Sequence, residues 1–221
     1  MKKIFLLASA AAFLTACNNS PKADSAQTSE KQTVVNAEGE TYPLDSTSLV
    51  TWIGSKPTGQ HTGTFKLKDG SLLIKDNALT GGNFTLDIAS LTNLDLAADV
   101  ENKGKLEGHL KSPDFFDVAK YPTAKFEITS VESFVADSTN KDIIMKDATH
   151  TIKGNLTLKD STKNISFPAK ISVDKNTATA FADFKIDRTQ WGMNYKGPNN
   201  PQDWFISKDV NIKLAIAATK K

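Results

Sequence analysis

The sequence predicts an all-β protein with one folded domain and eight or more antiparallel strands. Apolar and polar residues alternate over most of the chain after residue 41, as in Phe84, Leu86 and Ile88 against Thr85 and Asp87. A period of two is typical of strands with one buried and one wet face. Strands that all carry one apolar face need a facing sheet or closure on themselves, so a sandwich and a barrel are both candidates.

The other alternating segments define the expected strands. They are residues 49–53, 64–68, 125–129, 152–158, 165–173, 177–186 and 206–216. The dipeptide Asp69-Gly70 predicts a type I′ hairpin turn, Gly81 and Gly82 predict an interruption, and residues 159–162 predict a further connection.

Two segments lack this alternation. Residues 99–111 carry helix formers, with Leu106 and Leu110 one turn apart, and they end shortly before Pro113, so a short helix is expected. Residues 188–205 have no period and are expected as a long ordered loop. The aromatic residues of this loop are Trp191, Tyr195 and Trp204.

Composition excludes several classes of protein. The 221 residues carry 27 Lys+Arg against 25 Asp+Glu, a formal charge of +2, which is too balanced for an electrostatic nucleic-acid binder. Arg188 is the sole arginine, so bidentate recognition of phosphates is poorly supplied. The single cysteine, Cys17, excludes an internal disulfide.

The first 16 residues are predicted to be a signal peptide. Lys2 and Lys3 precede an apolar run over residues 4–14, which is too short to span a bilayer as an ordinary helix. Residues 14–17, Leu-Thr-Ala-Cys, resemble a bacterial lipobox. This resemblance implies cleavage before Cys17 and attachment of acyl chains, such as palmitate, to it. Asn18 and Asn19 stand where an inner-membrane retention signal commonly carries Asp, which favours the outer membrane.

Residues 17–40 are expected to form a lipidated cysteine followed by a flexible tether. The segment is rich in Ser, Thr, Ala, Lys, Glu and Gln and has too few apolar residues to order itself. A coil of this length has an r.m.s. reach of roughly 25–30 Å. The domain at residues 41–221 would then tumble near the membrane without touching it.

One stretch of the chain resembles a known family. Residues 109–118, with the sequence His-Leu-Lys-Ser-Pro-Asp-Phe-Phe-Asp-Val, are followed by Lys120, Tyr121 and Pro122, and then by Phe126. This pattern resembles the signature of the YceI family, and the resemblance extends from about residue 42 to residue 217. It departs from the family at residues 99–105, where many members carry an Arg-rich turn, and in its lipoprotein signal.

The resemblance implies a single antiparallel eight-stranded, lipocalin-like barrel with one short helix and a long aromatic loop. It also implies an apolar tunnel that binds a long-chain lipid or a polyisoprenoid. Eight strands are the size at which a barrel can hold one small ligand.

Inward-facing aromatic residues are the candidate ligand contacts. They are Phe65, Phe84, Phe115, Phe116, Phe126, Phe167, Phe184 and Trp191. The alternative is that these rings fill a solid core. Ala178, Ala180 and Ala182 share a face with Phe184 and would leave space, whereas the opposite register, with Phe181 inward, would remove it.

Polar candidates are few. Arg188 is expected either to stack on Trp191 and close one end of the barrel, or to contact a ligand head group. His109 is a second candidate for contact with the head group. The histidines His61, His109 and His150 have no local ligand spacing, so neither a metal nor another cofactor is expected.

The sequence therefore predicts a non-catalytic, membrane-anchored lipoprotein of the bacterial envelope that sequesters or transports a long apolar lipid. One alternative is an interaction protein with a solid barrel, whose loop from Trp191 to Trp204 meets a partner. Another is a hydrolase around His109, with Ser112 and Asp114 nearby. The expected catalytic set is empty, because no nucleophile elbow is present.

Overall fold

The structure is a computed structural model that describes residues 22–34, 36–135, 144–197 and 206–221. The predicted signal peptide, Cys17 and Trp204 lie outside the described residues. The elements, in chain order, are β1 (Asp24–Ser25), β2 (Gln27–Glu30), β3 (Glu40–Pro43), β4 (Leu49–Lys56), β5 (Gly59–Lys75), β6 (Ala78–Asn93), α1 (Val100–Lys111), β7 (Thr123–Ser133), β8 (His150–Leu158), β9 (Ser161–Val173), β10 (Thr177–Asp187), the 3₁₀ helix η1 (Arg188–Trp191) and β11 (Asp209–Thr219).

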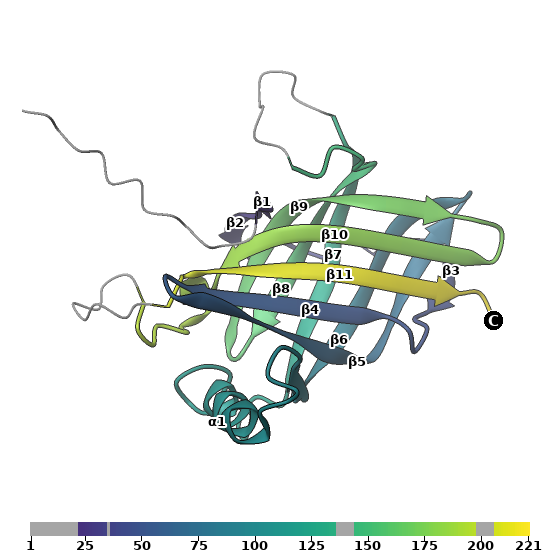
Figure 1. Cartoon of the computed structure of the whole chain (residues 1–221). Helices are drawn as coiled ribbons and strands as arrows, with labels where there is room; N and C mark the ends of the chain where they lie inside the picture. The colour runs from purple at the N-terminus through teal and green to yellow at the C-terminus, as the bar shows by residue number, and fades with distance from the viewer. Residues whose placement is uncertain (1–21, 35, 136–143, 198–205) are drawn as a thin grey trace, which may run out of the picture.

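Strands β4 to β11 close into an antiparallel barrel. Each pairs with the next along the chain, and β11 pairs with β4, which completes a circuit of eight strands (Figure 1). The predicted fold class is therefore confirmed. The alternating apolar residues face inward and form one core, in which Phe65, Phe126 and Phe184 are each at most 4% exposed.

The expected turn at Asp69 and Gly70 is wrong, because β5 runs straight through both residues. The register between β5 and β6 shifts between Leu67 and Asp69, which marks a bulge. Gly70 has φ +152°, and a Cβ there would lie 2.6 Å from the carbonyl oxygen of Asn83. Residue 70 is thus glycine because its backbone has a positive φ and the neighbouring strand leaves no room for a side chain, not because the chain reverses there.

The actual reversal between β5 and β6 lies at Asp76 and Asn77. Both have positive φ, 52° and 59°, which short polar side chains tolerate better than most. The expected interruption at Gly81 and Gly82 is also wrong, because both lie within β6. A Cβ on Gly81 would come within 2.6 Å of Ala37, so glycine leaves room for the N-terminal segment that crosses the sheet here.

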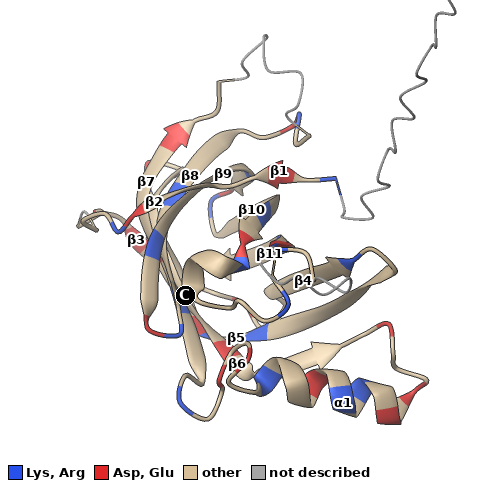
Figure 2. Ribbon diagram, turned by 90° about the vertical axis from the view of Figure 1, so that its left-hand side faces the viewer, with Lys and Arg blue, Asp and Glu red and all other residues tan. Residues whose placement is uncertain are grey.

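The predicted helix is present as α1 beside one end of the barrel (Figure 2). Asp99 is its N-cap, and the Asp99 carboxylate accepts a hydrogen bond from the backbone N–H of Asn102 at 3.1 Å. Glu107 ties the helix to the sheet, since its carboxylate accepts from the backbone N–H of the fully buried Asn93 at 2.7 Å.

The expectation of a flexible tether up to residue 40 is corrected by the segment before β3. Strand β1 pairs parallel with β10, and β2 pairs antiparallel with β9. Residues 23–32, which we call the strap, are thus ordered on the barrel wall. Their order comes from backbone pairing, because all four residues of β2 are exposed.

The register of β10 is the one that leaves space inside the barrel. Ala178 and Ala182 are 1% and 5% exposed and lie on the inner face with Phe184, whereas Phe181 is 49% exposed on the outer face. Small residues therefore occupy part of the inner wall.

We predict that Gly154→Ala destabilises the barrel by about 1–3 kcal/mol, the usual cost of overpacking. A Cβ at residue 154 would lie 2.2 Å from the ring of Phe126. The matched control is Gly54→Ala, where a Cβ would meet nothing within 4 Å. Urea unfolding measures both variants, and equal free energies of unfolding would contradict the packing described here.

Candidate functional site

The barrel encloses a cavity of about 260 Å³. One water needs only about 10–15 Å³ of such space, so the cavity is far larger than a packing defect. Its walls are almost entirely apolar side chains from the barrel strands and α1. Seven of the eight predicted aromatic contacts line it: Phe65, Phe84, Phe115, Phe116, Phe126, Phe167 and Phe184.

The aromatic residues contact one another without filling the interior. Phe167 and Phe184 stack with ring centroids 4.0 Å apart and planes within 11°. Phe84 packs against Phe126 at 5.2 Å, and Phe65 meets the edge of Phe116 at 5.4 Å. The rings therefore form the wall around the cavity, which disfavours the alternative of a solid core.

Trp191 is the exception among the predicted contacts, because it is not among the residues that line the cavity. Its ring is 1% exposed, and its indole N–H donates to the backbone carbonyl of Leu156 at 3.0 Å. Trp191 thus joins η1 to β8 and serves the packing of the wall.

Polar side chains line the cavity at one end, where α1, η1 and the β4–β5 hairpin lie. They are Ser55, Lys56, His61, His109, Arg188 and Ser207. Four of these six residues are Lys, Arg or His, and the rest of the lining is apolar. The cavity therefore has an apolar interior and a polar, cationic end.

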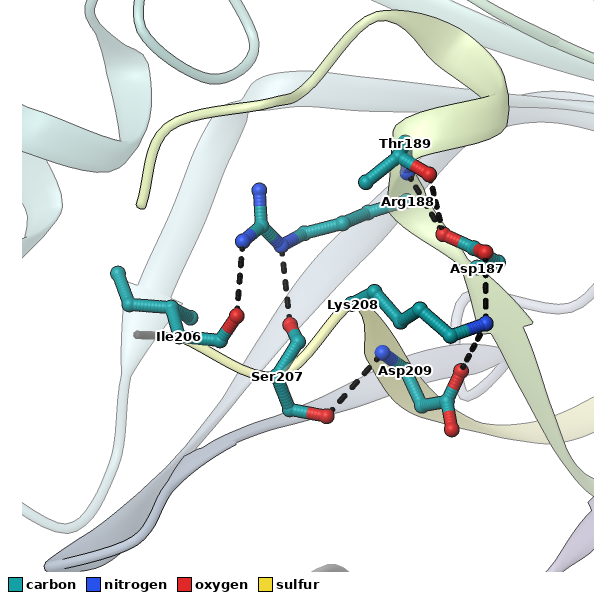
Figure 3. A network of polar contacts seen from close by, with 7 residues as sticks. All are labelled: Asp187, Arg188, Thr189, Ile206, Ser207, Lys208 and Asp209. Atoms are coloured by element: carbon teal, nitrogen blue, oxygen red, sulfur yellow. Dashed lines mark hydrogen bonds and ion pairs between the residues drawn. The ribbon is translucent and has the colours of Figure 1, made fainter. Parts of the chain in front are cut away.

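Arg188 fixes the loop at this end (Figure 3). Its Nε donates to the carbonyl of Ser207 at 3.0 Å, and one Nη donates to Tyr195 and Ile206 at 2.9 and 3.1 Å. The other Nη donates to the carbonyl of Met193. These bonds use four of the five guanidinium N–H groups.

The expected stacking of Arg188 on Trp191 is wrong. The ring under the guanidinium is that of Phe115, with 5.7 Å between the Arg188 Cζ and the ring centroid. Burial lowers the pKa of Arg188, and the negative charge of Asp187 opposes this effect. Arg188 closes this end of the barrel mainly by joining backbone segments.

Asp187 supports the same corner of the barrel (Figure 3). It accepts hydrogen bonds from the N–H and hydroxyl of Thr189 at 3.0 and 2.6 Å and from Lys208 Nζ at 2.9 Å. Partial burial acts to raise the pKa of Asp187, but the hydrogen bonds from Lys208 and Thr189 outweigh it and hold this pKa below its ordinary value of 3.8.

His109 pairs with a carboxylate and with aromatic rings. Its Nε2 lies 3.0 Å from Asp114 Oδ2, and its ring meets the edges of Phe115 and Tyr195 at 5.2 and 4.7 Å. Ser112 Oγ accepts from the backbone N–H of Asp114 at 3.3 Å. The serine thus shapes the turn after α1.

The other two histidines lie elsewhere. His61 Nδ1 contacts Asp95 Oδ2 at 2.7 Å, and His150 contacts the hydroxyl of Thr149 at 2.8 Å. Within the described ranges, no group of three His, Cys, Asp or Glu side chains could hold a metal ion. In the same part of the chain, no helix is long and apolar enough to cross a membrane.

Sequence reasoning did not identify several residues of the site. Trp52, Lys56 and His61 line the cavity, and Asn93 holds the loop to α1 through its side-chain amide, which donates to Asp95 at 2.7 Å. The alternation of Val50 and Trp52 places them on one strand face and could have predicted the inward position of Trp52. Lys56 and His61 lie beside a hairpin, where alternation carries no signal.

Family models match two parts of the chain. The model of the YceI-like domain matches residues 42–218, and the model of the prokaryotic membrane lipoprotein lipid attachment site matches residues 1–18. A UPF0312 protein of Azotobacter vinelandii is 36% identical over 95 residues, which cover 40% of this chain and 44% of that protein. Protein YceI of Escherichia coli is 33% identical over 111 residues, which cover 49% of this chain and 48% of that protein. The matches span less than half the length of these relatives.

Solved structures share the fold. A Burkholderia cenocepacia protein named BcnA superposes with a TM-score of 0.58 at 19% identity, covering 80% of this chain and 99% of that one. A polyisoprenoid-binding domain from Saccharophagus degradans, implicated in plant cell wall breakdown, gives a TM-score of 0.55 at 14% identity, covering 81% and 98%.

The depressed pKa of Asp187 predicts a pH dependence of stability. The stabilisation from this carboxylate is fully present above its unfolded pKa and is lost as pH falls through the folded pKa. Below about pH 4, the wild-type free energy of unfolding should therefore fall more steeply than that of Asp187→Asn. The slopes differ by at most about 1.4 kcal/mol per pH unit, the limit for one proton. Urea unfolding at stepped pH measures this, and parallel curves would refute the role of Asp187.

Proposed function

The chain belongs to the YceI-like family, and on that premise we propose that its barrel binds a long apolar lipid, of the polyisoprenoid kind, without catalysing a reaction on it. The observation that carries this proposal is the apolar cavity of about 260 Å³ inside a closed eight-stranded barrel. The polyisoprenoid-binding structural relative supports the class of ligand. The protein would sequester or carry such a lipid.

The energetics favour a ligand with a chain and little polarity. Each buried CH₂ contributes about 0.8 kcal/mol, and the lining offers few groups that a polar ligand could satisfy. This gain is partly offset by the conformational entropy that the flexible ligand chain loses on binding. The rigid barrel adds little to this entropy cost. In this proposal the seven lining phenylalanines hold the chain.

The polar end would receive the head group. His109 lines this end, and within the described residues Arg188 has one guanidinium N–H beyond the four that bind carbonyls. A hydroxyl, carbonyl or acidic head group would find donors there, while the apolar tail lies toward Phe84 and Phe126.

The lipid attachment site supports a lipid-anchored protein of the cell envelope. We place the anchor in the outer membrane, because Asn18 and Asn19 follow Cys17 where Asp commonly marks retention in the inner membrane. Proximity to a bilayer gives the barrel access to a reservoir of apolar chains.

The first test blocks the cavity. Leu214→Trp enlarges a lining side chain of β11, whereas Ala215→Trp adds the same ring to the exposed outer face one residue later. We expect Leu214→Trp to weaken binding of a fluorescent farnesyl alcohol at least about tenfold, roughly 1.4 kcal/mol. Ala215→Trp should bind as the wild type does. Fluorescence titration of detergent-free protein measures both.

Thermal unfolding distinguishes a blocked cavity from a damaged fold. Ile212→Phe, a smaller change in the same lining, serves if Leu214→Trp does not fold. Equal affinities for wild type and a folded cavity variant, or no binding by the wild type, would overturn the proposal.

The anchor has a separate test. Cys17→Ala removes the sulfur that the lipid attachment site would modify, so the variant should move from the membrane fraction to the soluble fraction on centrifugation of broken cells. A variant that still sediments with membranes, even after a high-salt wash, would contradict anchoring through Cys17.

A further inference from the structure

The strap, residues 23–32, lies where β9 and β10 pair over only part of their length. Within the described residues, β9 and β10 pair only between Lys170–Val173 and Ala178–Phe181. Toward the polar end the two strands separate, and the strap pairs with both of them. Asp24 lies opposite Phe184 of β10, and Thr28 lies opposite Ile165 of β9.

Both ends of the strap are fixed by hydrogen bonds. The Asp24 carboxylate accepts from the backbone N–H groups of Ile144 and Met145, each at 2.9 Å. At the other end, the backbone of Gln32 donates to the side chain of Asn155 at 3.0 Å and accepts from it at 2.7 Å. Asn155 is fully buried, and its Oδ1 also accepts from Asn164 at 3.1 Å, so the strap supplies the acceptor for its buried amide N–H group.

The middle of the strap is also held in place. The N–H of Ala26 donates to the carbonyl of Lys185 at 2.9 Å, and Ala26 packs against the hydrophobic core. Glu30 pairs with Lys163 of β9 at 2.7 Å. Ala23 is 6% exposed, so the strap buries apolar surface at its start as well.

The strap leaves few residues between the lipid attachment site and the first strand. Cys17 precedes Asp24 by seven residues, which span at most about 25 Å when fully extended. A free tether up to residue 40 would extend roughly three times as far. The strap also lies before residue 42, so it is outside the part of the chain that matches the family domain.

The outer face beside the strap carries apolar side chains. Phe181 of β10 is 49% exposed and lies opposite Ala215, which in turn lies opposite Leu49, 37% exposed. Ile144, bonded to the strap through Asp24, is 48% exposed. Phe181, Ala215 and Leu49 form an apolar row across β10, β11 and β4. Phe181 of this row lies three residues along β10 from Phe184, which is opposite Asp24 of β1.

Lysines border this row. Lys170 lies opposite Phe181 on β9, and Lys213 is on β11. They pair with Asp147 at 3.0 Å and Asp183 at 3.1 Å, which balances the charge of these two lysines. Contact of the row with a membrane would use apolar insertion and the long lysine stems.

We propose that the strap and the lipid anchor together fix the orientation of the barrel at the membrane. They hold the β9–β10 side of the barrel, with Phe181, against the bilayer that carries Cys17. The barrel then does not tumble freely at the membrane. The partner is a bilayer surface, and neither the ligand nor the cavity enters into the orientation.

The test measures which side of the barrel meets the lipid. Cys17 is the sole cysteine and is consumed by acylation, so one engineered cysteine in the full lipoprotein is the sole free thiol. Ala215→Cys reports on the proposed face. Lys68→Cys on β5, an exposed position four strands away from β9, reports on the opposite side.

Each variant is labelled with bimane and reconstituted in phosphatidylcholine vesicles that contain a headgroup-proximal nitroxide lipid. We expect quenching at residue 215 to be several-fold stronger than at residue 68. Replacing residues 24–30 with a Gly/Ser sequence of equal length should make the two positions equal. Ala26→Pro, which removes the N–H that bonds Lys185, should act in the same direction and serves if the replacement does not fold.

Equal quenching at the two positions in the wild type would overturn the proposal, as would a difference that survives both strap variants. Circular dichroism of each variant verifies the barrel. The readout needs no bound ligand, so the orientation can fail while lipid binding stands, and lipid binding can fail while the orientation stands.

Discussion

The cavity, its polar end and the position of the strap all depend on closure of the eight-stranded sheet into a barrel. An eight-stranded sheet that closes has no free edge and encloses a space just large enough for side chains or one small ligand. Here β9 and β10 pair only between Lys170–Val173 and Ala178–Phe181 and then diverge. The stacked rings of Phe167 and Phe184 bridge the divergence inside the barrel, and the strap pairs with both strands in the wall. One seam thus links the wall of the cavity to the segment that leads to the membrane.

The cavity and its polar end follow from the same closure. Ala178 and Ala182 on the inner face of β10 leave volume, and the surrounding phenylalanines give that volume an apolar wall. Beyond β10 the chain needs a firm support, because residues 188–197 turn away from the sheet. Arg188 supplies it by donating to the carbonyls of four residues, and Asp187 caps η1 while it pairs with Lys208. A buried guanidinium is tolerable here because backbone oxygens replace its water.

The sequence was informative where burial determined the structure. Alternation located the barrel strands, and the same alternation placed seven phenylalanines in the lining of the cavity. It failed at the strap, whose polar residues have no apolar period because backbone pairing, not burial, orders them. It also failed at Gly70, which sits inside a strand because of a bulge and a close contact with the neighbouring strand. The contact between Arg188 and the ring of Phe115 could not be predicted from the sequence either, because the two residues are 73 positions apart in the chain.

Native mass spectrometry of the lipoprotein purified from its own membranes shows whether the barrel carries a long apolar lipid. The sample should be extracted in a mild detergent and compared with the same protein after organic delipidation. The account predicts an added mass beyond that of the acylated chain, which delipidation removes and a farnesyl alcohol or longer isoprenoid restores. A spectrum that contains only the acylated chain, together with no uptake by delipidated protein, would contradict it.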